Sequence, residues 1–108
     1  MYAQLVETGA AETSEKDREF QEKIEEIYFE RDSARGLAGT HMWFAEEVGE
    51  LTHALRRGDH DELEGEFADV FAWLSTLASI SKIDLEEAVR KKYGGGCPRC
   101  TATPCACG

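Results

Sequence analysis

Two stretches in the middle of the chain constrain the fold most, because both carry apolar residues at helical spacing. The first, residues 40–57, repeats them every three or four positions, at Phe44, Val48, Leu51 and Leu55. The second, residues 61–80, is apolar over most of a helix circumference, at Phe67, Val70, Phe71, Trp73, Leu74, Leu77 and Ala78. A helix of the second kind belongs in the middle of a bundle or in a subunit interface. No segment of useful length alternates as a strand would. The sequence therefore predicts an all-α protein.

Capping residues and glycines predict where the helices begin and end. We expect helices over about residues 15–32, 40–57, 61–80 and 85–93. Their expected N-caps are Ser14, Thr40, Asp59 or Asp61, and Asp84. Gly36 and Gly39 should interrupt helical structure between the first two helices, and Gly58 should end the second helix. The expected organisation is an N-terminal lead-in over 1–14, a helical domain over 15–94 and a cysteine-rich tail over 95–108.

Length and charge exclude several classes of protein. The chain has 108 residues, which suggests one domain with a modest core and hence self-association. Its 22 acidic and 12 basic residues give a net charge of −10, which argues against binding to a nucleic-acid backbone. No apolar run approaches the roughly 20 residues of a membrane span, and the N-terminus does not resemble a signal peptide. We therefore expect a cytoplasmic protein with neither a nucleic acid nor a membrane as partner.

Carboxylates lie within both apolar stretches, where charged groups need a partner. With about 100° of rotation per residue, Glu47 and Glu50 share one flank of the first apolar face, whereas Glu46 points outward. In the second stretch, Glu66 and Asp69 also share one flank. The connection between the two helices is short, which predicts antiparallel packing. The two carboxylate pairs should then face each other across the seam.

Four carboxylates held together repel one another, and a hard divalent cation removes that cost. Mg²⁺ prefers oxygen ligands and is commonly bound through carboxylates together with substrate phosphates. Such a site can clamp a polyphosphate and activate a water molecule. The competing interpretation is that these are solvated glutamates on helix surfaces. A di-iron centre is a weaker rival, because it needs Glu-x-x-His motifs and only Glu50 and His53 form one, on the outer face.

The two acidic motifs resemble the EExxE…ExxD signature of the MazG-like, all-α nucleoside triphosphate pyrophosphohydrolases. The first motif is Glu46-Glu47-Val48-Gly49-Glu50-Leu51, and the second is Glu66-Phe67-Ala68-Asp69-Val70. The flanks match as well, with Arg35-Gly36 and Trp43 before the first motif and Ala72-Trp73-Leu74 after the second. The resemblance covers about residues 20–93, which is most of the chain.

The resemblance implies a bundle of four to five helices that assembles as a homodimer or homotetramer. It implies that Glu47, Glu50, Glu66 and Asp69 bind Mg²⁺, with Mn²⁺ as the alternative ion. Glu46 would lie outside the direct ligands or be structural. The implied reaction is hydrolysis of a ribo- or deoxyribonucleoside triphosphate to the monophosphate and pyrophosphate, by attack of water at the α-phosphorus. Its expected role is house-cleaning of nucleotide pools.

Basic and aromatic residues near these motifs are candidates for binding the nucleotide. Arg35 precedes the first motif, and Lys91 and Lys92 close the last helix, where basic residues also occur for reasons of the helix dipole. Trp43 and Trp73 flank the acidic stripes and could stack a base or serve as core.

The last twelve residues hold all four cysteines, as Cys97, Cys100, Cys105 and Cys107. The spacing C-x2-C-x4-C-x-C, with a Cys-Pro-x-Cys start, favours a tetrahedral Zn²⁺ knuckle. An iron–sulfur cluster and paired disulfides are the alternatives. A closed site with four thiolate ligands has no open coordination position, so we assign it to stability or docking rather than catalysis.

Two other functions fit parts of the pattern. The enzyme that hydrolyses phosphoribosyl-ATP in histidine biosynthesis shares the carboxylate plan, although Val-Gly-Glu-Leu and Ala-Trp-Leu look more like MazG. A non-enzymatic helical, zinc-containing protein-interaction module is the third hypothesis, in which the carboxylates are merely solvated.

Overall fold

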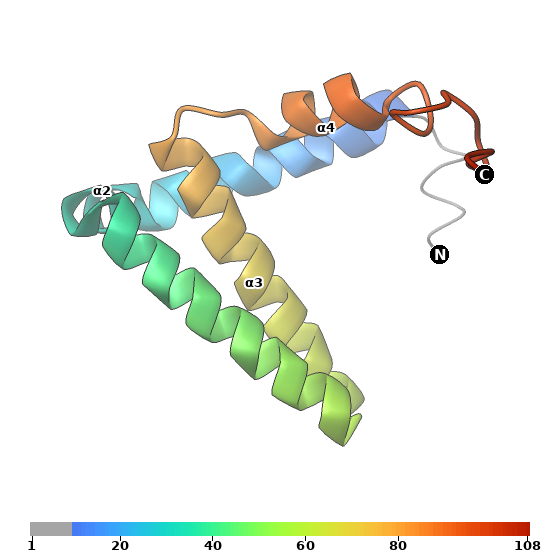
Figure 1. The fold of residues 1–108 in the computed structure, drawn as a ribbon. Coiled ribbons are helices and arrows are strands. Elements are labelled where there is room, and N and C mark those ends of the chain that lie inside the picture. Colours follow the sequence, from blue (N-terminus) through green and yellow to red (C-terminus); the bar gives the residue numbers. More distant parts are fainter. Residues whose placement is uncertain (1–9) are drawn as a thin grey trace. The chain divides into compact units, whose positions relative to one another are not determined.

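The computed structural model describes the backbone of residues 10–108 and the side chains of residue 16 and residues 18–108. This part of the chain contains three helices and no strand: α2 (Ala10–Arg57), α3 (His60–Ile80) and α4 (Leu85–Tyr93) (Figure 1). The all-α prediction is confirmed, whereas the expected count of four to five helices is not. The expected lead-in lies outside the described residues over 1–9, and its residues 10–14 are already helical.

The chain divides into two compact units. One comprises residues up to Phe20 together with Asp84–Gly108, and the other is Gln21–Ile83. Helix α2 therefore contributes its first turns to one unit and its remainder to the other. Within the described residues, no helix is long and apolar enough to cross a membrane.

Helix α2 runs through two of the expected helices, with a break at Gly36. The backbone of Gly36 has φ 87° and ψ 168°, a left-handed conformation that glycine adopts without a steric penalty. The expected break is therefore present, but helical structure resumes at once, so the predicted N-cap at Thr40 is wrong. Thr40 lies inside the helix with 0% of its surface exposed. The N-cap predicted at Ser14 is also wrong, because α2 begins at Ala10.

The other helix boundaries follow the capping residues. Gly58, with φ 74°, ends α2 and donates its N–H to the Ala54 carbonyl at 2.9 Å. Asp59 caps α3 and accepts from the Glu62 N–H at 3.2 Å. Asp84 caps α4 in the same way, accepting from Glu87 N–H at 3.1 Å.

In the Gln21–Ile83 unit, the part of α2 after Gly36 and helix α3 run antiparallel, side by side (Figure 1). The predicted apolar stripe of α2 is only partly covered, because Val48 and Leu55 are 38% and 55% exposed whereas Phe44 and Leu51 are half-buried. Ala54, on the flanking stripe, is fully buried. Glu47, on the same flank, has a carboxylate oxygen within 4.8 Å of oxygens of Glu66 and Asp69, so the acidic flank of α2 faces α3.

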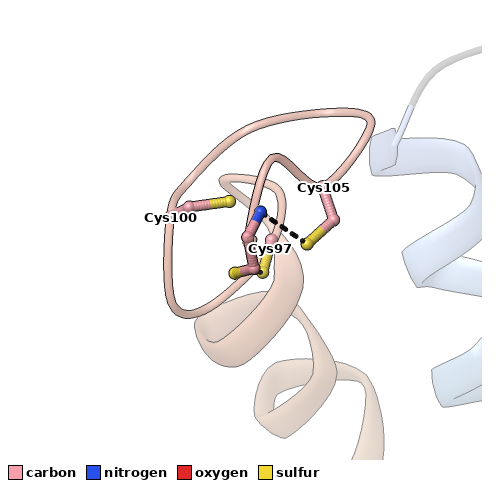
Figure 2. A group of neighbouring side chains, drawn as sticks. Cys97, Cys100 and Cys105 are labelled. Carbon is pink, nitrogen blue, oxygen red and sulfur yellow. Dashed lines mark hydrogen bonds between the residues drawn. The ribbon is translucent and has the colours of Figure 1, made fainter.

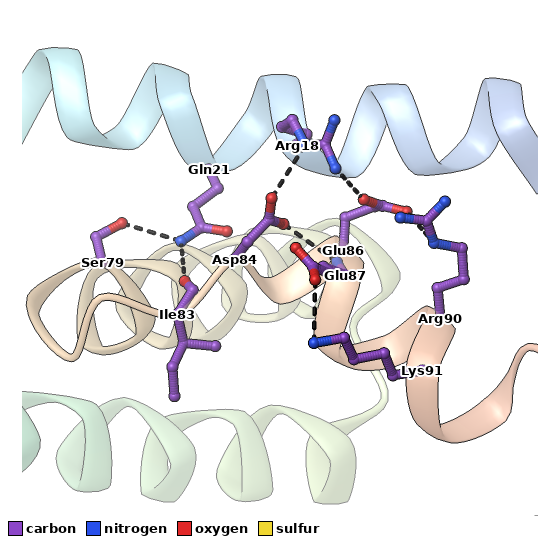
Figure 3. Close-up of polar contacts among 9 residues, drawn as sticks. All are labelled: Arg18, Gln21, Ser79, Ile83, Asp84, Glu86, Glu87, Arg90 and Lys91. Carbon is purple, nitrogen blue, oxygen red and sulfur yellow. Dashed lines mark hydrogen bonds and ion pairs between the residues drawn. The ribbon is translucent and has the colours of Figure 1, made fainter.

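The same unit is held by polar contacts as well as apolar ones. Gln21 Nε2 donates to Ser79 Oγ at 3.1 Å and to the Ile83 carbonyl at 2.9 Å (Figure 3). Among the described residues, the buried hydrophobic side chains are only Ile24, Ala54 and Ala78. A core this small contributes little hydrophobic stabilisation to a single chain.

In the other unit, ion pairs attach α4 to the first turns of α2. Arg18 Nε lies 3.1 Å from Asp84 Oδ2, and its guanidinium also pairs with Glu86 (Figure 3). Glu86 is 3% exposed and is approached from its own helix by Arg90 Nε at 3.3 Å. Opposite charges on both sides of this buried carboxylate compensate for its desolvation.

Candidate metal and nucleotide site

Three of the four predicted carboxylates lie together in the structure. One oxygen each of Glu47, Glu66 and Asp69 can be chosen so that all lie within 4.8 Å of one another. Glu66 and Asp69 are three residues apart on α3, so they share one side of that helix. Glu47 faces them from α2 because the two helices run antiparallel.

The remaining acidic residues of the first motif lie farther out. Glu50 is exposed one turn after Glu47 and is not one of that group of three. It still belongs to the same electrostatic environment, because its charge raises the pKa values of both Glu47 and Glu66. Glu46 is exposed and lines a second cavity, whose wall also includes Glu50 and Glu66 of the predicted site together with His53 and Arg57.

Positive charge compensates the carboxylate cluster only in part: the charge of Arg57 lowers the pKa of Glu66, but the other effects on this group raise it. Burial, assisted by the charges of Glu50, Asp69 and Glu66, raises the pKa of Glu47 from 4.5 to about 7. Burial and the charges of Glu50, Asp69 and Glu62 raise the pKa of Glu66 more than the charge of Arg57 lowers it. Moreover, Glu47 Oε2 and Glu66 Oε2 are buried without a hydrogen-bond partner among the described residues. Unpartnered buried carboxylate oxygens with raised pKa values are what a divalent cation would satisfy.

A cavity of about 480 Å³ adjoins this cluster, with Asp69 in its wall. The rings of Trp43 and Trp73 line it and are nearly parallel, with an interplanar angle of 10° and centroids 6.2 Å apart. The Arg35 guanidinium lies 5.2 Å from the centre of the Trp73 ring, within the range of a cation–π interaction. The cavity therefore combines aromatic surface and a cation next to the carboxylates.

A buried aspartate that the sequence reasoning missed fixes this arginine. Asp32 is 3% exposed and accepts from Arg35 Nη1 at 2.9 Å and from Thr76 Oγ1 at 3.1 Å. Gly39 leaves room for the arginine stem, since a Cβ there would lie 2.8 Å from Arg35 Cγ. The only sequence signal was an aspartate three residues before the candidate arginine, which is common in a chain this acidic.

The two predicted lysines of α4 are in the other compact unit. Lys91 Nζ lies 3.0 Å from Glu87 Oε1, one turn back on the same helix. Lys92 Nζ lies 5.8 Å from the centre of the Tyr93 ring. Their proposed role in phosphate binding stays a prediction.

The four cysteines also come together, in the loop that follows α4. Their sulfur atoms all lie within 4.8 Å of one another, so this cluster could hold a metal ion (Figure 2). It belongs to the same unit as α4 and is separate from the carboxylate cluster.

The protein is all-helical, and two of its helices bring an acidic cluster beside an aromatic cavity. The carboxylates of such a cluster could hold a metal ion. The comparison with known families makes the assignment more specific. The family of the MazG nucleotide pyrophosphohydrolase domain matches residues 36–101, more than half of the chain. The chain therefore belongs to that family, which confirms the resemblance seen in its motifs. No curated protein matches the chain.

Proposed function

We propose that this protein is a Mg²⁺-dependent pyrophosphohydrolase of ribo- or deoxyribonucleoside triphosphates. It would release the monophosphate and pyrophosphate by attack of water at the α-phosphorus. The observation that carries the proposal is the pair of buried, unpartnered oxygens of Glu47 and Glu66 beside Asp69. A MazG nucleotide pyrophosphohydrolase domain over residues 36–101 supports the same reaction class.

In this proposal Glu47, Glu66 and Asp69, joined by Glu50, hold Mg²⁺ or Mn²⁺. Bound there, the ion supplies charge neutralisation for the phosphates and a lower pKa for its water. The residues contribute the hard oxygen ligands that such ions require. Glu46, which is exposed and shares a cavity wall with Glu50 and Glu66, lies outside the direct ligands or is structural.

The cavity beside the cluster accommodates the nucleoside in this proposal. Trp43 and Trp73 offer aromatic surface for a base, and Arg35 offers charge for a phosphate. Asp32 acts as a positioning residue, because its bonds to Arg35 and Thr76 hold the guanidinium over Trp73. Lys91 and Lys92 are weaker phosphate candidates, since Lys91 is already paired with Glu87.

We also propose that the protein works as a homodimer or homotetramer in the cytoplasm, in house-cleaning of nucleotide pools. The support for assembly is the apolar surface of the Gln21–Ile83 unit, where large side chains are more than one third exposed. These include Val48, Leu55, Phe67, Phe71 and Leu74. Many exposed large apolar side chains on two neighbouring helices are typical of surfaces that are covered in an assembly.

The test is release of pyrophosphate from a panel of nucleoside triphosphates and phosphoribosyl-ATP, with and without Mg²⁺. Glu66→Gln and Asp69→Asn should lower kcat at least about 100-fold, as removal of a charge-stabilising group typically does. The matched control is Glu64→Gln, on the same helix but exposed and paired with His60 on that helix. Full activity in Glu66→Gln would refute the assignment of the metal site. If the protein hydrolysed phosphoribosyl-ATP but none of the nucleoside triphosphates, the proposed substrate would be wrong.

A further inference from the structure

The cysteine tail carries an inference that goes beyond nucleotide hydrolysis. Residues 94–108 contain no helix or strand, and the sulfur atoms of the tail all lie within 4.8 Å of one another. Cys97 and Cys100 are half-buried, whereas Cys105 and Cys107 are exposed. Figure 2 shows the three labelled side chains turned toward one another from different parts of the loop.

The spacing of the sulfur atoms fits a tetrahedral metal site better than it fits disulfides. Cys97 Sγ and Cys107 Sγ are 3.8 Å apart, and all four cysteines are free. In a tetrahedron with Zn–S distances of about 2.3 Å, neighbouring sulfur atoms are about 3.8 Å apart. A disulfide would need sulfur atoms about 2.05 Å apart.

Backbone hydrogen bonds shape the loop around these thiols. Thr101 N–H donates to the Cys97 carbonyl at 2.7 Å, and Cys97 N–H donates to the Ala102 carbonyl at 3.1 Å. These two bonds close the turn that contains Cys97 and Cys100. Gly96 begins the turn with φ 107°, and a Cβ there would lie 2.8 Å from Thr103 Oγ1. The loop is thus folded tightly enough to require glycine at this position.

Two further backbone N–H groups point at sulfur. Ala106 N–H donates to Cys100 Sγ at 3.3 Å, and Cys107 N–H donates to Cys105 Sγ at 3.4 Å. Hydrogen bonds to sulfur favour the thiolate, which is the form that binds metal. Four convergent thiolates would repel one another unless a soft cation lay between them.

We propose that Cys97, Cys100, Cys105 and Cys107 bind one Zn²⁺ in a closed, structural site that orders the tail after α4. The thiolates select a soft or borderline ion, whereas the carboxylates of the other unit select a hard one. With four protein ligands the zinc has no open position for substrate. In this proposal the zinc site stabilises the tail, and the carboxylate site of the other unit carries out hydrolysis.

The test is the metal content of the full-length protein, purified without added chelator and measured by elemental analysis. We expect about one Zn²⁺ per chain, as in structural sites with four cysteine ligands. Cys100→Ser and Cys105→Ser should each lose most of the zinc, while Arg99→Ala, an exposed neighbour, should keep it. Replacement of zinc by Co²⁺ should give the intense visible and near-ultraviolet bands of a tetrahedral thiolate complex.

Iron with acid-labile sulfide would overturn the zinc assignment in favour of a cluster. Metal-free protein with paired disulfides, or zinc retained by both cysteine variants, would overturn the site. Glu66→Gln should keep its zinc although it loses hydrolysis. Zinc binding and hydrolysis can therefore fail independently, and each failure identifies the proposal that is wrong.

Discussion

Replacement of Glu47 by glutamine should stabilise the metal-free protein at alkaline pH while abolishing its response to Mg²⁺. The pKa of Glu47 is raised from 4.5 to about 7 by burial and by the neighbouring charges of Glu50, Asp69 and Glu66. In the unfolded chain this carboxyl ionises at its ordinary pKa. Between these two pKa values, Glu47 is ionised in the unfolded chain but still protonated in the folded protein. The free energy of unfolding therefore falls as the pH rises from the lower pKa to the higher one.

The size of the effect follows from the interval between the two pKa values. At about 1.4 kcal/mol for each pH unit, raising the pKa from 4.5 to about 7 sets an upper limit of about 3.5 kcal/mol. Because the side chain is only half-buried, solvent screening reduces this, and we expect about 1–2 kcal/mol. This loss of unfolding free energy should be absent below pH 4.5 and complete above about pH 7.

The assay is urea unfolding in a chelator at pH 5.5 and pH 8, at one fixed protein concentration. The window from pH 5.5 to pH 8 covers somewhat more than half of the pKa interval, so Glu47→Gln should remove about 1 kcal/mol of the difference in unfolding free energy between the two pH values. Glu64→Gln, which deletes one equally charged but exposed carboxylate, controls for the general effect of net charge. Added Mg²⁺ should stabilise the wild type at pH 8 but not Glu47→Gln. Identical pH dependence in Glu47→Gln and wild type would refute the electrostatic reasoning.

Three further predictions concern other parts of the Gln21–Ile83 unit. Asp32→Asn should lower kcat/KM about 10-fold or more, mainly through a higher KM, because Arg35 loses its charged partner. Steady-state kinetics measure this, and an unchanged KM would contradict the positioning role of Asp32. Leu55→Glu should shift the protein toward monomer, because it places a charge on an apolar side chain that is 55% exposed; light scattering after size exclusion measures this, and an unchanged mass would remove Leu55 from the interface. Gly36→Ala should destabilise the fold by about 1–2 kcal/mol, because an alanine resists a left-handed backbone. Nothing lies within 4 Å of the added Cβ, so a loss measured by denaturant unfolding would not come from a clash, and an unchanged free energy of unfolding would contradict the prediction.

Much of the local structure followed from the sequence because it depends on neighbouring residues. Asp59 and Asp84 cap the helices that follow them, and Gly58 ends α2, since each interaction spans only a few residues. The spacing of Glu66 and Asp69 placed both on one side of α3, as the helical repeat requires. Thr40 failed as a cap because α2 resumes immediately after Gly36 and satisfies its own backbone hydrogen bonds.

The tertiary structure decided which helix face is covered and which distant residues meet. Periodicity separated Leu55 from Ala54 but could not show that the alanine would be fully buried while the leucine stayed 55% exposed. The bond from Thr76 to Asp32 joins residues 44 positions apart, and no local pattern predicts such a contact. The sequence by itself thus determined that the chain is helical and which side of each helix carries its carboxylates. The packing of α2 against α3 decided which carboxylates converge, because convergence depends on the approach of two helices rather than on the repeat of either one.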